Sequence, residues 1–149
     1  MIIKDNITEI LKNSPINEVS INCTTITIFP LKEIKKINLS KPSHIDNDWI
    51  IIGDEDLCGD LICINSNSES LPVYLVPIDD ELEFEYISSS LNNLIEILLM
   101  LKEISIGRDT PVKYEQNPLP EDELNQFLQK VKLFNPDCEL QFWSELFEV

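Results

Sequence analysis

Short apolar runs occupy the middle of the chain and predict β-strands. Residues 49–52, 61–64 and 73–78 are apolar at neighbouring positions, and the segment EFEYIS follows them at residues 83–88. A strand that is apolar at successive positions is covered on both faces of its sheet. The links GDEDLCGD and NSNSES are short and polar, as in hairpins. The pattern therefore predicts an antiparallel meander.

The first forty or so residues change between helical and extended patterns. Ile7, Ile10 and Leu11 share one side of a helix predicted at residues 4–13. Residues 19–29 are rich in β-branched side chains and predict a strand, but the apolar positions change parity after Cys23. A bulge or a turn near residues 24–25 would reconcile the two halves. Pro30 then opens one or two helical turns.

Amphipathic helices follow the predicted strands. The stretch from Leu91 to residue 104 carries a broad apolar stripe, with Ser90 as its N-cap and Gly107 and Pro111 as its end. A second helix is predicted at residues 121–134 and a short last one after NPD. The fold class is α+β: a central antiparallel sheet, a meander, packed with helices. Residues 1–149 form a single domain, with C-terminal helices at 120–147.

The net charge of −16 changes the functional picture. A strongly negative surface disfavours nucleic acid and anionic membranes as partners and attracts basic proteins. Solubility is the alternative explanation for this acidity. The charge is uneven, because no Lys or Arg lies between Lys41 and Lys102. That interval holds these acids: Asp46, Asp48, Asp54, Glu55, Asp56, Asp60, Glu69, Asp79, Asp80, Glu81, Glu83, Glu85 and Glu96. Such a segment predicts a surface for a positively charged partner.

Metal binding is the least favoured interpretation of the acidic link at 54–60. Counted as a calcium loop from Asp54, the link places Cys58 where a hard oxygen ligand is needed and Asn65 where a bidentate carboxylate is needed. Strands flank it, whereas a calcium loop of this kind requires helices. The four cysteines form no CxxC pair, and His44 is the only histidine. We therefore predict no metal site and no cofactor, and keep an acidic metal-binding module as the third alternative.

Enzyme motifs are missing from the sequence. It contains no GxSxG, Walker, Rossmann or HExxH pattern, and His44 lies in a polar stretch without a nucleophile nearby. We predict a binding protein without catalytic residues. No signal peptide or membrane span is read from the sequence, so the prediction is a cytoplasmic protein with reduced thiols.

The order of several short motifs resembles the SUKH superfamily over residues 26–104. The segments that carry the resemblance are ITIFPLKEIKKIN, WIIIGDEDLCGDLICIN, LPVYLVPIDDE and ISSSLNNLIEIL. The matching positions are Phe29, Pro30, Leu31, Asn38, Ile52, Gly53, Gly59, Asp60, Pro72, Val73, Tyr74 and Ser90. Residues 1–18 lack the N-terminal signature of the superfamily, and Leu91 replaces the usual aromatic residue after the helix-opening serine.

The resemblance implies an immunity protein that binds and neutralises a cognate basic toxin, often a nuclease. Another branch of the superfamily consists of regulatory adaptors, so an adaptor domain of the same fold is the alternative. The matching glycines, Asp60 and Ser90 are interpreted as residues that shape the fold. Partner contacts are predicted on two acidic loops, at Asp54, Glu55, Asp56, Asp79, Asp80, Glu81, Glu83 and Glu85. Oligomeric state stays open.

Overall fold

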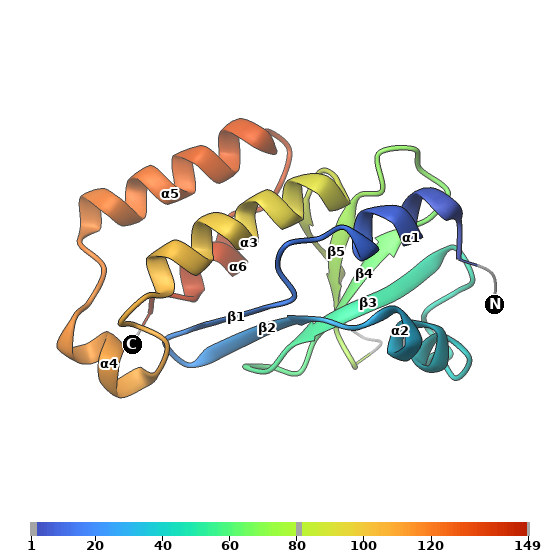
Figure 1. Ribbon diagram of the computed structural model, residues 1–149, viewed down its shortest axis with the longest axis horizontal. Helices are drawn as coiled ribbons and strands as arrows, with labels where there is room; N and C mark the ends of the chain where they lie inside the picture. Colours follow the sequence, from blue (N-terminus) through green and yellow to red (C-terminus); the bar gives the residue numbers. More distant parts are fainter. Residues whose placement is uncertain (1–2, 80–81, 149) are drawn as a thin grey trace.

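The computed structural model describes residues 3–79 and 82–148 and shows one α+β domain (Figure 1). Its six-stranded sheet has the order β1-β2-β3-β4-β5-β6, and every neighbouring pair is antiparallel. The predicted meander is confirmed, and the sheet twists strongly from β1 to β5 (Figure 1). The strands are β1 (Glu18–Ile21), β2 (Thr24–Ile28), β3 (Trp49–Glu55), β4 (Leu61–Asn65), β5 (Val73–Val76) and β6 (Glu85–Ser88).

One face of the sheet carries the main core. Ile26, Ile62 and Ile87 point to this face and are fully buried or nearly so. The helix α3 (Leu91–Ser105) crosses this face, with α5 (Glu121–Phe134) outside it and α6 (Gln141–Glu145) packed nearby (Figure 1). Trp143 of α6 is fully buried, and its indole N–H donates to the carbonyl of Ile87 at 2.9 Å. The C-terminal segment is thereby fixed to the edge strand β6.

The opposite face carries a smaller apolar cluster. Its buried members are Ile45, Ile51, Cys63 and Val76. The helix α2 (Leu31–Asn38) packs against β3. Asn38 joins the two elements, because its amide donates to the carbonyl of Ile51 at 2.8 Å and its carbonyl accepts from the N–H of Ile51 at 2.9 Å. Burial of both faces explains why the middle strands are apolar at successive positions.

The N-terminal elements agree with the sequence pattern in type and differ slightly in position. The helix α1 (Asp5–Lys12) buries Ile7 and packs against α2. The extended stretch divides into β1 and β2 at a turn formed by Asn22 and Cys23, two residues before the predicted break. Asn22 has φ +54°, in the left-handed region that asparagine tolerates better than most residues.

One helix was not predicted. The helix α4 (Pro111–Gln116) begins at Pro111, and the hydroxyl of Thr110 accepts from the N–H of Lys113 at 3.2 Å as its N-cap. Proline at the first turn of a helix sacrifices no intrahelical hydrogen bond, so Pro111 starts a helix here. No helix within residues 3–79 and 82–148 is both long enough and apolar enough to cross a membrane.

Candidate functional site

The meander brings the two acidic loops to the same end of the sheet. In an antiparallel meander, β3 and β5 run in the same direction, so the links that follow them leave the sheet at the same end. The pairing of Leu61 with both Asp54 and Val76 fixes this arrangement. Ile78 Cδ1 lies 3.6 Å from the position that a Cβ atom on Gly59 would occupy, so the loops are neighbours. We call this region the acidic end; its described carboxylates are those of Asp54, Asp56, Asp60, Asp79, Glu83 and Glu85.

Glu55 does not belong to the exposed part of this region. The side chain is only 3% exposed. Its carboxylate accepts backbone N–H groups from Leu57 at 2.9 Å, Asp60 at 3.0 Å and Cys58 at 3.3 Å. A carboxylate that accepts several N–H groups of one turn holds that turn in place. The prediction that Glu55 contacts a partner is therefore corrected: Glu55 organises the β3–β4 turn from the inside.

A β-bulge explains why Glu55 points inward. The register between β3 and β4 shifts between Ile51 and Gly53, so Ile52 is an extra residue in β3. Without the bulge, Glu55 would share a face with Ile51; with it, Glu55 pairs with Ile26 on the core face. Gly53 permits the close approach of β2, because a Cβ at this position would lie 2.0 Å from the carbonyl oxygen of Thr27.

Asp54 and Asp56 flank Glu55 and point away from the core. Asp54 is half-buried on β3, and no hydrogen bond to its carboxylate is found among the described residues. Burial, followed by the nearby carboxylates of Asp56 and Glu55, raises the pKa of Asp54. Asp56 is exposed and its Oδ1 accepts from the N–H of Thr25 at 2.6 Å. The acidic turn is thus tied to β2, while the Asp56 side chain stays exposed.

Asp60 and Glu85 extend the negative region toward the C-terminal segment. Burial raises the pKa of Asp60, and the charge of Glu55 adds to this effect. Glu85 is half-buried and accepts from the N–H of Phe142 at 3.1 Å. Burial raises its pKa; the Phe142 hydrogen bond opposes that rise, and the charges of Glu139, Glu145 and Asp60 reinforce it.

Glu139 and Glu145 adjoin the acidic end, and sequence reasoning missed them. They come next to β6 because the N–H of Glu139 donates to the carbonyl of Tyr86 at 3.0 Å and because Trp143 is anchored on β6. These contacts join segments more than fifty residues apart. The apolar spacing of the last helix was the one signal that could have indicated its docking, and it did not specify the strand.

The predicted β5–β6 loop is described in part. Asp79 and Glu83 are exposed. Asp80 and Glu81, which were also predicted to contact a partner, lie outside the described residues. Asp79 and Glu83 therefore represent this loop in the site.

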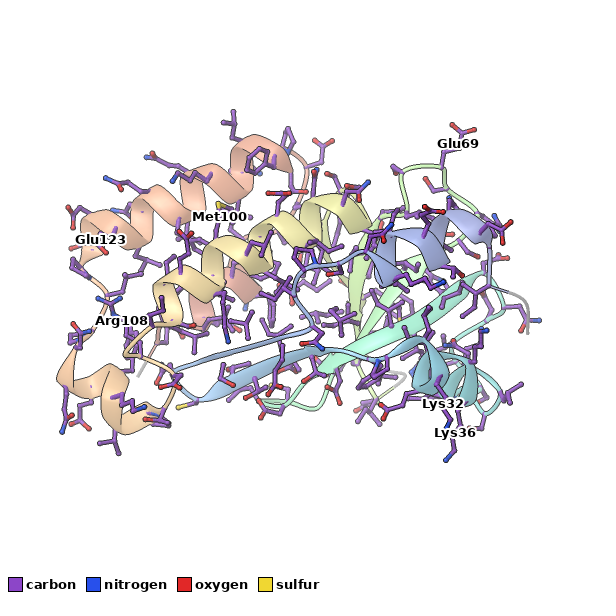
Figure 2. All side chains as sticks on the ribbon, in the orientation of Figure 1. Lys32, Lys36, Glu69, Met100, Arg108 and Glu123 are labelled. Atoms are coloured by element: carbon purple, nitrogen blue, oxygen red, sulfur yellow. The ribbon has the colours of Figure 1, made fainter. Side chains whose placement is uncertain are left out.

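Positive charges are placed elsewhere or are already engaged. Lys32 and Lys36 project from α2 (Figure 2). The guanidinium of Arg108 donates to the carbonyl of Asn117 at 2.7 Å and to that of Ile104 at 3.1 Å, which fixes the end of α3. Between described residues, the structure shows one ion pair, at 3.1 Å between Lys113 of α4 and Asp109, which precedes that helix. Leaving Asp79 aside, no carboxylate of the acidic end forms an ion pair with Lys, Arg or His among the described residues.

The described residues hold no cluster of side chains that could ligate a metal ion. Within 3–79 and 82–148, no three His, Cys, Asp or Glu side chains could share a metal ion. Cys58 is an exposed residue of the acidic turn. Partial desolvation of its thiol and the charges of Glu55, Asp60 and Glu145 raise its pKa, which disfavours the reactive thiolate. The hollow of about 410 Å³ between α1 and α3 is lined by residues of those helices and of the link after α1, and by none from the acidic end.

Comparisons with protein-family models, with curated proteins and with solved structures find no match to this chain. The resemblance to the SUKH superfamily therefore stays a prediction that rests on the quoted residues. Several of them do shape the fold, as expected. Gly59 has φ +76°, and the hydroxyl of Ser90 accepts from the N–H of Asn93 at 3.0 Å at the start of α3.

Proposed function

We propose that the protein is an immunity protein that binds and neutralises a cationic toxin, with a nuclease as the favoured class. The observation that carries this proposal is the convergence of two acidic loops at one end of the sheet, where burial and, after it, nearby carboxylates raise the pKa of Asp54 and of Glu85. Such repulsion costs stability in the free protein and is relieved when a cationic surface binds.

A nuclease fits the chemistry of this surface. Enzymes that cleave nucleic acid bind phosphates through clusters of Lys and Arg. Carboxylates on a protein surface can take the place of those phosphates and block the cleft. Binding of this kind requires no cofactor and no turnover, and it acts in the compartment where the toxin would do harm, which we propose to be the cytoplasm. The resemblance to the SUKH superfamily supports the same assignment.

Co-expression tests this proposal. The gene is expressed together with a basic toxin encoded beside it, and survival of the host cell is measured. Protection is expected from the wild-type chain and is expected to be lost in the double variant Asp54→Lys/Asp79→Lys. The matched control Glu69→Lys/Glu123→Lys makes the same change in net charge on exposed residues of other elements (Figure 2) and should protect as the wild type does. Equal protection by both variants would contradict the proposed docking region.

A further inference from the structure

Three aliphatic side chains are exposed within the acidic end: Leu57, Ile78 and Leu82, the last of which is 60% exposed in the β5–β6 loop. Leu57 lies in the β3–β4 turn with 52% of its surface exposed, and Ile78 lies just after β5 with 64% exposed. Neither belongs to the apolar clusters of the described residues. Ile78 packs beside Gly59 of the neighbouring turn, so Leu57 and Ile78 are carried by adjoining loops. The acidic end therefore contains exposed apolar surface as well as carboxylates.

The charge around Leu57 and Ile78 restricts what can cover them. Asp56 precedes Leu57 and Asp79 follows Ile78, and both acids are exposed. A second copy of the chain would bring another charge of −16 to the contact. Nucleic acid and anionic lipid are disfavoured for the same reason. Charge complementarity leaves a cationic protein surface as the occupant.

Resting on the proposed function, we propose that Leu57 and Ile78 are the apolar anchors of the docking surface. The partner they fit is a cationic protein surface on which Lys and Arg side chains surround an apolar recess. In protein interfaces, a few well-buried side chains carry most of the affinity, while charges at the rim steer association. The anchors should therefore govern the rate of dissociation, and the carboxylates the rate of association.

Two short peptides of equal positive charge provide the probe. Both consist of alternating lysine and serine; one has serine at its centre and the other phenylalanine. Each is titrated into the full chain at low ionic strength, and binding is followed by amide chemical shifts in NMR spectra. We expect the phenylalanine peptide to bind about tenfold more tightly, as an apolar anchor typically provides. Leu57→Ser/Ile78→Ser should abolish this advantage and leave the affinity for the serine peptide unchanged.

Leu133→Ser is the control variant, because Leu133 is 77% exposed on α5. It should leave both affinities unchanged. If both peptides bind equally and Asp54→Asn/Asp79→Asn weakens both, the anchor proposal is wrong and the acidic docking surface stands. If the advantage of phenylalanine survives in Leu57→Ser/Ile78→Ser, the anchor proposal is likewise overturned. If neither peptide shifts the resonances of the acidic end, both proposals fail.

Discussion

The substitution Glu55→Gln should destabilise the protein, although it removes one negative charge from a very acidic chain. The wild-type carboxylate accepts three backbone N–H groups with both oxygens. Glutamine keeps one accepting oxygen and turns an NH2 group toward the remaining donors. At least one N–H in the turn then loses its acceptor, at about 1–3 kcal/mol, and the retained bonds lose their charge assistance. We expect a total loss of about 2–3 kcal/mol.

The neighbouring substitution Asp54→Asn is the matched control. It makes the same change in net charge one residue earlier in β3, where burial and, after it, the like charges of Asp56 and Glu55 raise the pKa of the acid. Removing this repulsion should leave the free energy of unfolding unchanged or raise it by up to about 0.5 kcal/mol. The two variants are therefore expected to move stability in opposite directions, which a general relief of net charge would not produce.

Urea unfolding measures both effects. Trp143 is fully buried, so its fluorescence reports the transition. The midpoint of Glu55→Gln should fall without a change in the denaturant slope, and its melting temperature should fall by roughly 4–12 °C. A free energy of unfolding for Glu55→Gln within about 0.5 kcal/mol of the wild type, the size of a neutral surface change, would refute the structural role of Glu55. So would an equal loss in Asp54→Asn.

Three further results are expected. Gly53→Ala should cost about 3 kcal/mol or more in urea unfolding, because its Cβ would lie 2.0 Å from a backbone oxygen of β2; unchanged stability would contradict the close strand approach. Ser90→Ala should lower the free energy of unfolding by about 1 kcal/mol through loss of the α3 N-cap. Ser90→Asp should retain most of the wild-type stability, because aspartate can also cap the helix. The folded state holds protons more tightly at Asp54, Asp60 and Glu85 than the unfolded state does, so these groups should stabilise the fold as the pH falls from 7 toward the ordinary carboxyl pKa values of 3.8 and 4.5. Asp54→Asn/Asp60→Asn should flatten that gain, and an unchanged pH profile in this variant would count against it.

Features that depend on local spacing were predictable from the sequence. The α5 helix has the predicted bounds, Glu121–Phe134, because the apolar period and the preceding prolines act within a few residues. Ser90 caps α3 for the same reason. Pro111 shows the limit of such reasoning: proline is compatible both with the end of one helix and with the first turn of another, and only the Thr110 cap distinguishes the two.

Features that depend on register or on distant contacts were not predictable in this way. The burial of Glu55 follows from one extra residue, Ile52, in β3, and a bulge changes which face every later side chain of the strand takes. Glu139 and Glu145 add negative charge beside the acidic end only because the C-terminal segment docks on β6. The sequence predicted a surface made of the acidic segments. The strand order of the structure shows that the two loops lie at the same end of the sheet.

The most direct test of the proposed docking surface is the association rate with the toxin that we propose the chain neutralises, measured by stopped flow at several salt concentrations. Asp54→Lys/Asp79→Lys should reduce the rate constant by about tenfold at low salt and weaken its dependence on salt. Glu69→Lys/Glu123→Lys, with the same net charge, should change the rate by less than about twofold. Equal slowing by the two variants would mean that the overall charge, and not this end of the sheet, attracts the partner.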